Sequence, residues 1–384
     1  MSSIYFKEEH ILLQTMIRDF AKNEIAPLAR NIDDEEKFPS LSMKKIKDLG
    51  LMGIPWEQKY GGGGMDTLSL VIVINEIAKV CVSTAATLMA HTSLGTGPFQ
   101  YFGTDIQKET YLSKLASGEM IGSFALTEPS AGSDAGSTQT NAKIEGDYFI
   151  VNGQKMFCTN AGYSGCIIFT SNVIENGENK GIAALFVDKD TDGLRIGPPE
   201  HKMGWRGSDT RAVYFDNMKI SKENILGTPG KGFKQFLKTL TGGRISISAL
   251  AIGTAEGAYE LALKYSNERD AFGKKINNFQ AVGFKLADMA TQIEASKQLT
   301  YHAAWLKDNN KDVIKEAAMA KLFSSESAMK ITTEAIQIHG GYGYIKEYNV
   351  ERFFRDAKIL EIGEGTSEVQ RIVILREILN NSNL

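Results

Sequence analysis

The chain has 384 residues, enough for two or three domains at about 150 residues each. Hydrophobic residues make up 42% and charged residues 23%, which excludes a disordered or collagen-like chain. With 43 Lys and Arg against 46 Asp and Glu, the net charge is −3, so there is no basic excess for binding nucleic acid. The scattered cysteines Cys81, Cys158 and Cys166 predict no disulfide framework.

The first third of the chain is predicted to be helical. Apolar residues recur at helical spacing from Ile11 to Ile25, and another helix is predicted from Thr67 to about Val80. The N-terminus shows neither a signal-peptide pattern nor an Arg-rich stretch, and the longest apolar run, Leu68–Ile74, is too short to span a bilayer. We therefore expect a cytoplasmic protein with no membrane partner.

The character of the sequence changes near Gly122. Turn signals such as Asn152-Gly153 and Asp192-Gly193 separate short runs that are typical of β-strands. These runs are Phe149–Val151, Ile167–Phe169, Ala183–Val187 and Ala212–Phe215. They predict an all-β middle region.

Helical periodicity returns after about Gly232. The segments that are mostly free of helix breakers are 244–268, 279–307, 313–338 and 367–379. Four long helices predict an antiparallel bundle. We expect an N-terminal α-helical domain over residues 1–120, a middle β domain over 121–230 and a C-terminal helical bundle domain over 231–384. Strands and helices do not alternate, which disfavours a doubly wound sheet.

Several common site motifs are absent from the sequence. No G-x-G-x-x-G follows a predicted strand, so a Rossmann nicotinamide site has no support. There is no P-loop, no H-E-x-x-H and no paired C-x-x-C. We therefore predict no metal site.

Two motifs in the middle region suit a flat cofactor. A predicted strand runs into a loop of small residues over Phe124–Asp134, where backbone N–H groups and hydroxyls can approach flavin or pyrophosphate oxygens. Strand alternation puts Phe157 and Thr159 on one face, so that an aromatic ring and a hydroxyl could stack on and bond to such a cofactor. The same patterns also fit an ordinary β-turn and a packed strand face.

Three motifs in the last third could also serve a site. Glu364 lies between Gly363 and Gly365, where it could press against a ligand and act as a base, or simply be a solvated residue in a capping turn. The segment 334–343 ends a helix with more glycines than a cap needs. The segment Glu268–Gly273, with Gln280, could clamp a pyrophosphate and an adenine, or be an exposed charged helix end.

Together, in this order along an α–β–α chain, these motifs resemble the acyl-CoA dehydrogenase family over nearly the whole length. The resemblance implies a multidomain α+β fold with an N-terminal helical domain, a middle antiparallel β-barrel and a C-terminal four-helix bundle. It also implies FAD bound without a Rossmann fold. By this resemblance the FAD contacts are Phe124, Leu126, Thr127, Ser133, Phe157, Thr159, Arg269, Phe272, Gln280, Gln337, Gly340, Gly341, Thr366 and Glu368.

The resemblance implies further that the set from Arg269 to Gly341 serves the FAD of a neighbouring subunit. A homo-oligomer follows, usually a tetramer built as a dimer of dimers. The residues expected near the acyl-CoA are Ser133, Thr241, Arg244 and Gly365.

Glu364 matches the catalytic base of the family. The implied reaction is α,β-dehydrogenation of an acyl-CoA thioester to the trans-2-enoyl-CoA, as in fatty acid β-oxidation, with electrons passed to electron-transfer flavoprotein. Some branches of the family place the base just before Arg244, but Gly243 occupies that position here and cannot serve. Burial by the acyl chain would raise the pKa of Glu364.

Two positions depart from the common family pattern. Gly363 stands where many members have Tyr, and Thr241 stands where an acidic residue is common. The Gly-Glu-Gly turn and the run Ala90–Leu94 resemble butyryl-type members, so short straight acyl chains are expected. The alternatives are a flavin-dependent oxidase or monooxygenase on the same fold, or a non-catalytic acyl-CoA-binding relative. The length of the chain and the presence of Glu364 favour the dehydrogenase.

Overall fold

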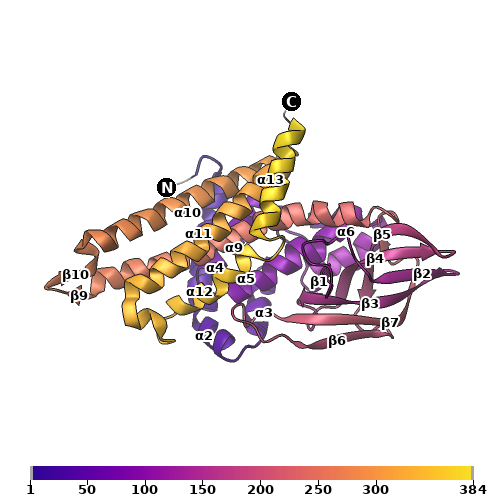
Figure 1. Cartoon of the computed structure of the whole chain (residues 1–384), viewed down its shortest axis with the longest axis horizontal. Coiled ribbons are helices and arrows are strands. Elements are labelled where there is room, and N and C mark those ends of the chain that lie inside the picture. Colours follow the sequence, from indigo (N-terminus) through magenta and orange to yellow (C-terminus); the bar gives the residue numbers. More distant parts are fainter. Residues whose placement is uncertain (1–2, 382–384) are drawn as a thin grey trace.

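The computed structural model describes residues 3–381, and these form two helical regions and a sheet. In Figure 1 the sheet lies at one end of the elongated molecule, while the small hairpin β9–β10 lies at the other end. The N-terminal helices are α1 (Glu8–Phe20), η1 (Ala21–Ile25), α2 (Ala26–Asp34), α3 (Ser40–Asp48), η2 (Gln58–Tyr60), α4 (Thr67–Ala78), α5 (Val82–Met89), η3 (Ala90–Thr96), α6 (Gly97–Phe102), α7 (Asp105–Gln107), η4 (Lys108–Leu112) and α8 (Ser113–Ala116).

Helix α4 confirms the prediction for Thr67 onward and lies in the centre of the helical core. Asp66 caps its N-terminus by accepting a 2.8 Å hydrogen bond from the backbone of Ser69. All twelve residues of α4 are buried, and the polar Asn75 and Glu76 among them are paired with Glu256 and Arg18. Helix α1 buries Leu13 and Ile17 but leaves Leu12 65% exposed, so its apolar stripe is only partly covered within one chain.

The middle region is the expected β domain. Its strands are β1 (Gly122–Ala125), β2 (Asn141–Glu145), β3 (Tyr148–Thr159), β4 (Cys166–Glu175), β5 (Glu178–Asp188), β6 (Leu194–Pro199), β7 (Thr210–Ser221) and β8 (Ile225–Leu226). They form one sheet in the order β6-β7-β3-β2-β4-β5-β8, with β1 paired to β4. The sheet is mostly antiparallel, but β4 pairs in parallel with both β1 and β2. Strand β1 also contacts η3 of the N-terminal helical region.

The last third contains the expected long helices. Its elements are α9 (Gly232–Glu268), β9 (Asp270–Ala271), β10 (Lys274–Lys275), η5 (Ile276–Asn278), α10 (Gln280–Asp308), α11 (Ile314–His339), η6 (Gly340–Tyr344), α12 (Val350–Ala357), η7 (Lys358–Glu361) and α13 (Ser367–Asn381). Helix α9 begins at Gly232, earlier than the predicted residue 244. Gly242 and Gly243 do not interrupt it, because its buried contacts outweigh their low helix propensity.

One hydrophobic core joins the N-terminal and C-terminal helical regions. It includes buried side chains of α1, α4 and α5 together with those of α9, α10 and α11. A stacked pair of rings, Phe124 of β1 and Phe236 of α9 with centroids 4.2 Å apart, connects this helical body to the sheet. The boundaries near residues 120 and 230 stay a prediction. Within residues 3–381, no helix is both long and apolar enough to cross a bilayer.

Candidate active site

A strained turn between η7 and α13 carries Glu364. Glu364 has φ = +53° and Gly365 has φ = +94°, so both are left-handed. This conformation costs a residue with a side chain about 1–2 kcal/mol. Gln370 stabilises the turn by donating from Nε2 to the carbonyl oxygens of Glu364 at 3.3 Å and of Gly365 at 2.8 Å. Lys321 of α11 donates a second bond to the Gly365 carbonyl at 2.8 Å.

The Glu364 carboxylate is buried but not hydrogen-bonded. Neither Oε1 nor Oε2 has a partner among the described residues, although both atoms are shielded from solvent. Burial raises the pKa of this carboxyl to about 7, while the positive charges of Lys321 and Arg244 oppose the increase. A carboxylate with free lone pairs and a pKa near neutrality is suited to removing a proton from a ligand.

Three elements converge on this carboxylate. A Cβ atom at Gly243 of α9 would lie 1.9 Å from Glu364 Oε2 and 3.2 Å from Leu94 Cδ2 of η3. Arg244, the next residue on α9, is 5% exposed, and its Nε has no partner within the described chain. Gly243 has no side chain that could act as a base, and the Glu364 carboxylate occupies the space where a side chain at position 243 would lie.

The loop after β1 is held by a buried ion pair. Lys155 of β3 is fully buried, and its Nζ lies 2.7 Å from Glu128 Oε1 and 3.2 Å from the Leu126 carbonyl oxygen. Burial would raise the pKa of Glu128, but the bonds from Lys155 and Thr138 lower it to about 2. The Met156 N–H also donates to the Thr127 carbonyl at 2.8 Å. These contacts fix the backbone at Leu126 and Thr127.

Phe157 lies next to this loop with its ring largely uncovered. The pairing of β3 with β7 shifts register between Lys155 and Cys158, and Phe157 adopts φ = +57° within this bulge. Its side chain is 62% exposed, while Cys158 is buried and Thr159 is half-buried. An exposed aromatic ring on a strained backbone is a ready surface for a flat ligand.

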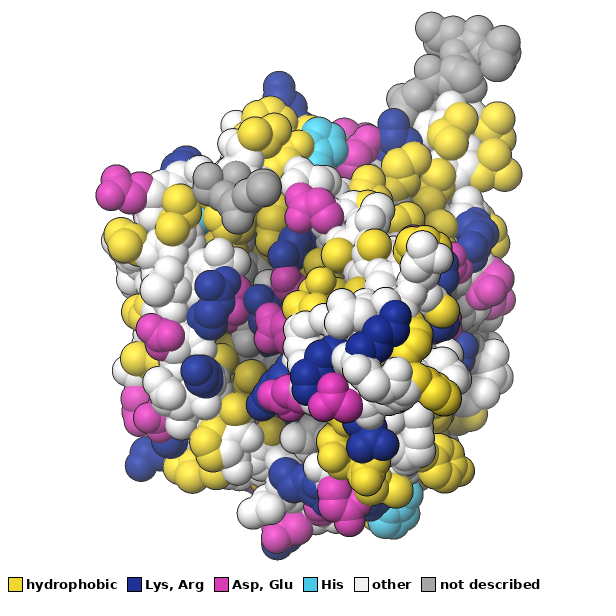
Figure 2. All heavy atoms as spheres, turned by 90° about the vertical axis from the view of Figure 1, so that its left-hand side faces the viewer, with side chains coloured by type: hydrophobic (Ala, Val, Ile, Leu, Met, Phe, Trp, Pro, Cys, Tyr) yellow, Lys and Arg dark blue, Asp and Glu magenta, His cyan; other side chains and the backbone are white. Residues whose placement is uncertain are grey.

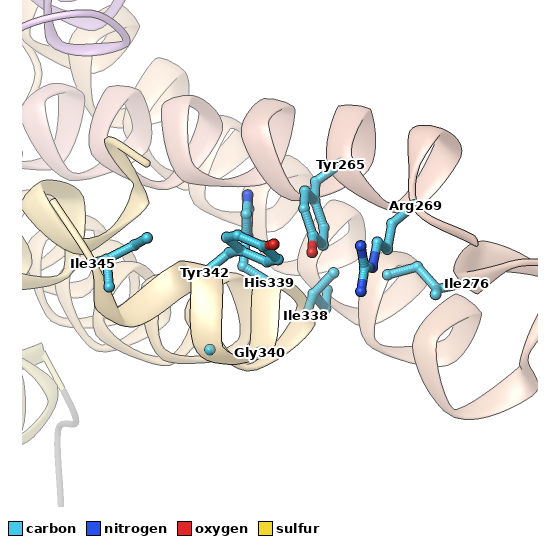
Figure 3. A pocket seen from close by; sticks show the side chains of 9 residues that line it. Tyr265, Arg269, Ile276, Ile338, His339, Gly340, Tyr342 and Ile345 are labelled. Atoms are coloured by element: carbon cyan, nitrogen blue, oxygen red, sulfur yellow. The ribbon is translucent and has the colours of Figure 1, made fainter. Parts of the chain in front are cut away.

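A second set of predicted residues lies at the far end of the bundle. A cavity of about 460 Å³ there is lined by Tyr265 and Arg269 of the α9 end and by the turn at Gly340 and Gly341 (Figure 3). The Arg269 guanidinium lies 5.6 Å from the centre of the Tyr342 ring. Phe272 is 96% exposed with φ = +50°. Gln280 and Gln337 are also exposed.

The chain does not bring these two sets together. Arg269 directly precedes β9, whereas Phe157 belongs to the sheet, and Figure 1 shows these elements at opposite ends.

Thr366 caps α13 beside the Glu364 turn, accepting a bond from the Val369 N–H at 3.3 Å. The other predicted site residues are Ser133 and Glu368, both exposed, and Thr241, half-buried on α9.

Sequence reasoning missed Lys321 and Gln370. Each lies on a long helix, and a single Lys or Gln within a helix carries no motif. Only the fold shows that both side chains meet the Glu364–Gly365 backbone.

Comparison with known proteins gives a consistent result over the whole chain. Family models described as the acyl-CoA dehydrogenase N-terminal, middle and C-terminal domains match residues 7–119, 123–218 and 230–379. "Probable acyl-CoA dehydrogenase YngJ" of Bacillus subtilis is 52% identical over 97% of this chain and 98% of its own. The short-chain specific acyl-CoA dehydrogenase of Clostridium acetobutylicum is 46% identical over 96% of this chain and 98% of its own.

Solved structures agree with these relatives. The butyryl-CoA dehydrogenase of Megasphaera elsdenii superposes with a TM-score of 0.95 at 41% identity, over 99% of this chain and all of the other. A chain from a structure described as the electron transferring flavoprotein of Acidaminococcus fermentans gives 0.96 at 42% identity, with the same coverage. An acyl-CoA dehydrogenase complexed with FAD from Bacillus anthracis gives 0.93 at 32% identity, over 98% of this chain and 68% of the other.

Proposed function

The chain belongs to the acyl-CoA dehydrogenase family, and from this premise we propose that it catalyses FAD-dependent α,β-dehydrogenation of a short-chain acyl-CoA. The observation that carries the proposal is the buried Glu364 carboxylate, which has no hydrogen-bond partner among the described residues. The product is the trans-2-enoyl-CoA, formed when the thioester loses its α-proton and a β-hydride.

Glu364 removes the α-proton. Its free oxygen lone pairs accept the proton without first breaking a bond, and its pKa of about 7 leaves a large share of the enzyme in the ionised form at neutral pH. The α-proton of a thioester is weakly acidic, so the enolate oxygen must be stabilised as it forms. We assign this role to the Glu364 backbone N–H, by family resemblance. The half-buried Gly365 and buried Arg244 lie beside the acyl-CoA.

The residues around the β1 loop fit a flavin. The fixed backbone at Leu126 and Thr127 offers polar groups, and the uncovered ring of Phe157 offers a stacking surface. Held by these residues, FAD would supply the acceptor for the hydride that leaves the substrate β-carbon. Phe124, Ser133, Thr159, Thr366 and Glu368 complete the proposed contacts of this chain with its own FAD.

The second set of residues serves the FAD of a neighbouring subunit. Arg269 adjoins β9 and lines the same cavity as the Gly340–Gly341 turn, and β9 lies at the opposite end of the molecule from the sheet (Figure 1). Figure 2 shows the end face that carries the β9–β10 hairpin, where Lys, Arg, Asp and Glu side chains lie beside apolar ones. On this part of the chain, Arg269 suits a phosphate and the exposed ring of Phe272 suits an adenine. The set is completed by Gln280 and Gln337.

A homotetramer accounts for the exposed apolar side chains of α13. Ile372, Leu375 and Ile378 are 65%, 57% and 47% exposed, and Figure 2 shows apolar side chains gathered on the protruding C-terminal helix. A patch of this kind on a chain of this size is typical of an interface. We assign a second copy of the chain to this patch. We further propose that electron-transfer flavoprotein reoxidises the reduced cofactor.

Anaerobic reduction of the purified flavoprotein by a panel of acyl-CoAs tests the proposal. Butyryl-CoA should bleach the oxidised flavin faster than long or branched acyl-CoAs, and electron-transfer flavoprotein should reoxidise it faster than oxygen does. A colourless protein that cannot be loaded with FAD would contradict the proposal. Rapid reoxidation by oxygen alone would instead support an oxidase.

A further inference from the structure

Lys321 is a fully buried cation directly beneath the turn that carries Glu364. It lies on α11, and its side chain has no exposed surface. Within residues 3–381, the hydrogen bond of its ammonium group goes to the Gly365 carbonyl oxygen at 2.8 Å. Lysine is almost never fully buried without a specific partner, and here that partner is the backbone next to the catalytic base.

The positive charge of Lys321 also acts on the Glu364 carboxylate, although Lys321 makes no hydrogen bond to it. The positive charge opposes the effect of burial on the pKa of Glu364, yet neither carboxylate oxygen has a hydrogen-bond partner among the described residues. Burial in turn lowers the pKa of Lys321 to about 8, and Glu364 and Glu361 counteract this. At neutral pH the ammonium group is therefore largely charged, while about half of the Glu364 carboxyl is ionised.

The charged groups around this pair come from four elements. Arg244 of α9 faces Glu364. Glu361 of η7 and Glu326 of α11 face Lys321. Burial and the positive charge of Arg376 of α13 lower the pKa of Arg244. Lys321 itself both acts on the Glu364 carboxylate through its charge and donates a hydrogen bond to the Gly365 carbonyl in the same turn.

We propose that Lys321 is a positioning residue for the base, which fixes the Glu364–Gly365 turn through the Gly365 carbonyl and supplies a buried positive charge that favours the ionised carboxylate while leaving its oxygens free. The inference rests on the proposed function, because it assumes that Glu364 removes the substrate proton.

Gln370 provides a matched control within the same turn. It donates to the same Gly365 carbonyl at 2.8 Å, and also to the Glu364 carbonyl at 3.3 Å, but it has no charge. Gln370→Met therefore removes backbone support alone. Lys321→Met removes both the support and the charge, and Lys321→Arg retains the charge.

The experiment measures the pH dependence of the flavin reduction rate divided by the butyryl-CoA dissociation constant, from about pH 5.5 to 9.5. This ratio reports the ionisation of the free enzyme. The acid limb of Lys321→Met should move about one pH unit higher, since an opposite charge at close range typically shifts a carboxyl by about 1–3 units. The acid limb of Lys321→Arg and Gln370→Met should stay in place, although Gln370→Met should reduce the rate at every pH.

An acid limb in Lys321→Met that coincides with that of Gln370→Met would overturn the inference. If Lys321→Met does not fold, Lys321→Gln replaces it, with the same expected shift. If neither neutral variant retains FAD while Lys321→Arg does, the charge serves the fold rather than the base, and the inference also fails. Glu364→Gln is measured in parallel, and full flavin reduction by this variant would refute the proposed function itself. If Glu364→Gln is inactive but the acid limb of Lys321→Met is not shifted, only the role of Lys321 is refuted.

Discussion

Gly243 and Glu364, 121 positions apart in the chain, are in such close contact that a methyl group at position 243 would lie 1.9 Å from the carboxylate oxygen Oε2. The glycine on α9 therefore determines where the base can stand. A side chain at this position and the present orientation of Glu364 exclude each other.

Gly243→Ala should displace the carboxylate and reduce the rate of flavin reduction by roughly 10²-fold, the cost of misplacing a catalytic group by about 1 Å. Gly242→Ala is the matched control, because its Cβ would meet only the flexible end of Lys307, at 3.2 Å. Both changes replace Gly by Ala in the same helix. Stopped-flow reduction by butyryl-CoA measures both variants, and equal rates in the two would show that Gly243 does not determine the position of the base.

Gly363→Tyr should fold, retain FAD and change the preference among acyl-CoAs. Gly363 is not in the left-handed region, and a Cβ there would meet only the Ile359 carbonyl oxygen, at 3.4 Å. A tyrosine at this position restores an aromatic wall that many relatives have. The control is Gly365→Ala, since Gly365 has φ = +94° and its Cβ would lie 2.7 Å from Gln370 Nε2, so activity toward every substrate should fall together. Full activity with an unchanged chain-length profile in Gly363→Tyr would contradict the prediction.

The sequence predicts the fold well where periodicity is long. The segments at 279–307 and 313–338 correspond to α10 (Gln280–Asp308) and α11 (Ile314–His339) within one residue at each end. Periodicity is predicted to return after about Gly232, but the long segment predicted from residue 244 in fact begins at Gly232, since tertiary packing lets α9 continue through Gly242 and Gly243. The parallel pairing of β1 with β4 is also beyond local patterns, since strand order depends on long-range contacts.

For the site, the sequence identifies the residues with a family pattern but not those that support them. Glu364 and Phe157 are both predicted, and both prove to lie at positive φ, a strain that no pattern shows. Lys321 and Gln370 have no motif, so their bonds to the turn are visible only in three dimensions. The roles of the individual site residues stay predictions until the variants are measured.

Burial of Glu364 should make the protein less stable as the pH rises. Its pKa is about 7 in the folded chain, against 4.5 as the ordinary value, so the folded chain holds this proton more tightly than the unfolded chain does. The contribution of the carboxyl to the free energy of unfolding is therefore fully present below about pH 4.5 and is lost as the pH rises through 7. Glu364→Gln does not titrate, and should gain up to about 3 kcal/mol relative to wild type between those limits. Thermal unfolding without substrate at several pH values measures this, with the exposed Glu119→Gln as the control. A difference between Glu364→Gln and wild type that does not change with pH would contradict the raised pKa.

Arg269→Ala should weaken FAD retention and oligomer stability together. Arg269 lines the far cavity and is assigned to the pyrophosphate of a neighbour's FAD, where a charge-assisted bond contributes roughly 1.5–3 kcal/mol. A cofactor that binds only the assembled protein also stabilises the assembly, so excess FAD should partly restore it. Arg195→Ala is the control, because Arg195 also lies over an aromatic ring, that of Tyr214, but on the sheet. Sedimentation and FAD titration measure both variants. Unchanged FAD affinity in Arg269→Ala would refute the shared site.

The most direct test of Glu364 as the base is anaerobic flavin reduction by butyryl-CoA in Glu364→Gln. The substitution keeps the side-chain volume and removes the proton acceptor, so FAD and butyryl-CoA should still bind. The reduction rate should fall by at least about 10²–10⁴-fold. Near-normal reduction in this variant would show that another group removes the proton.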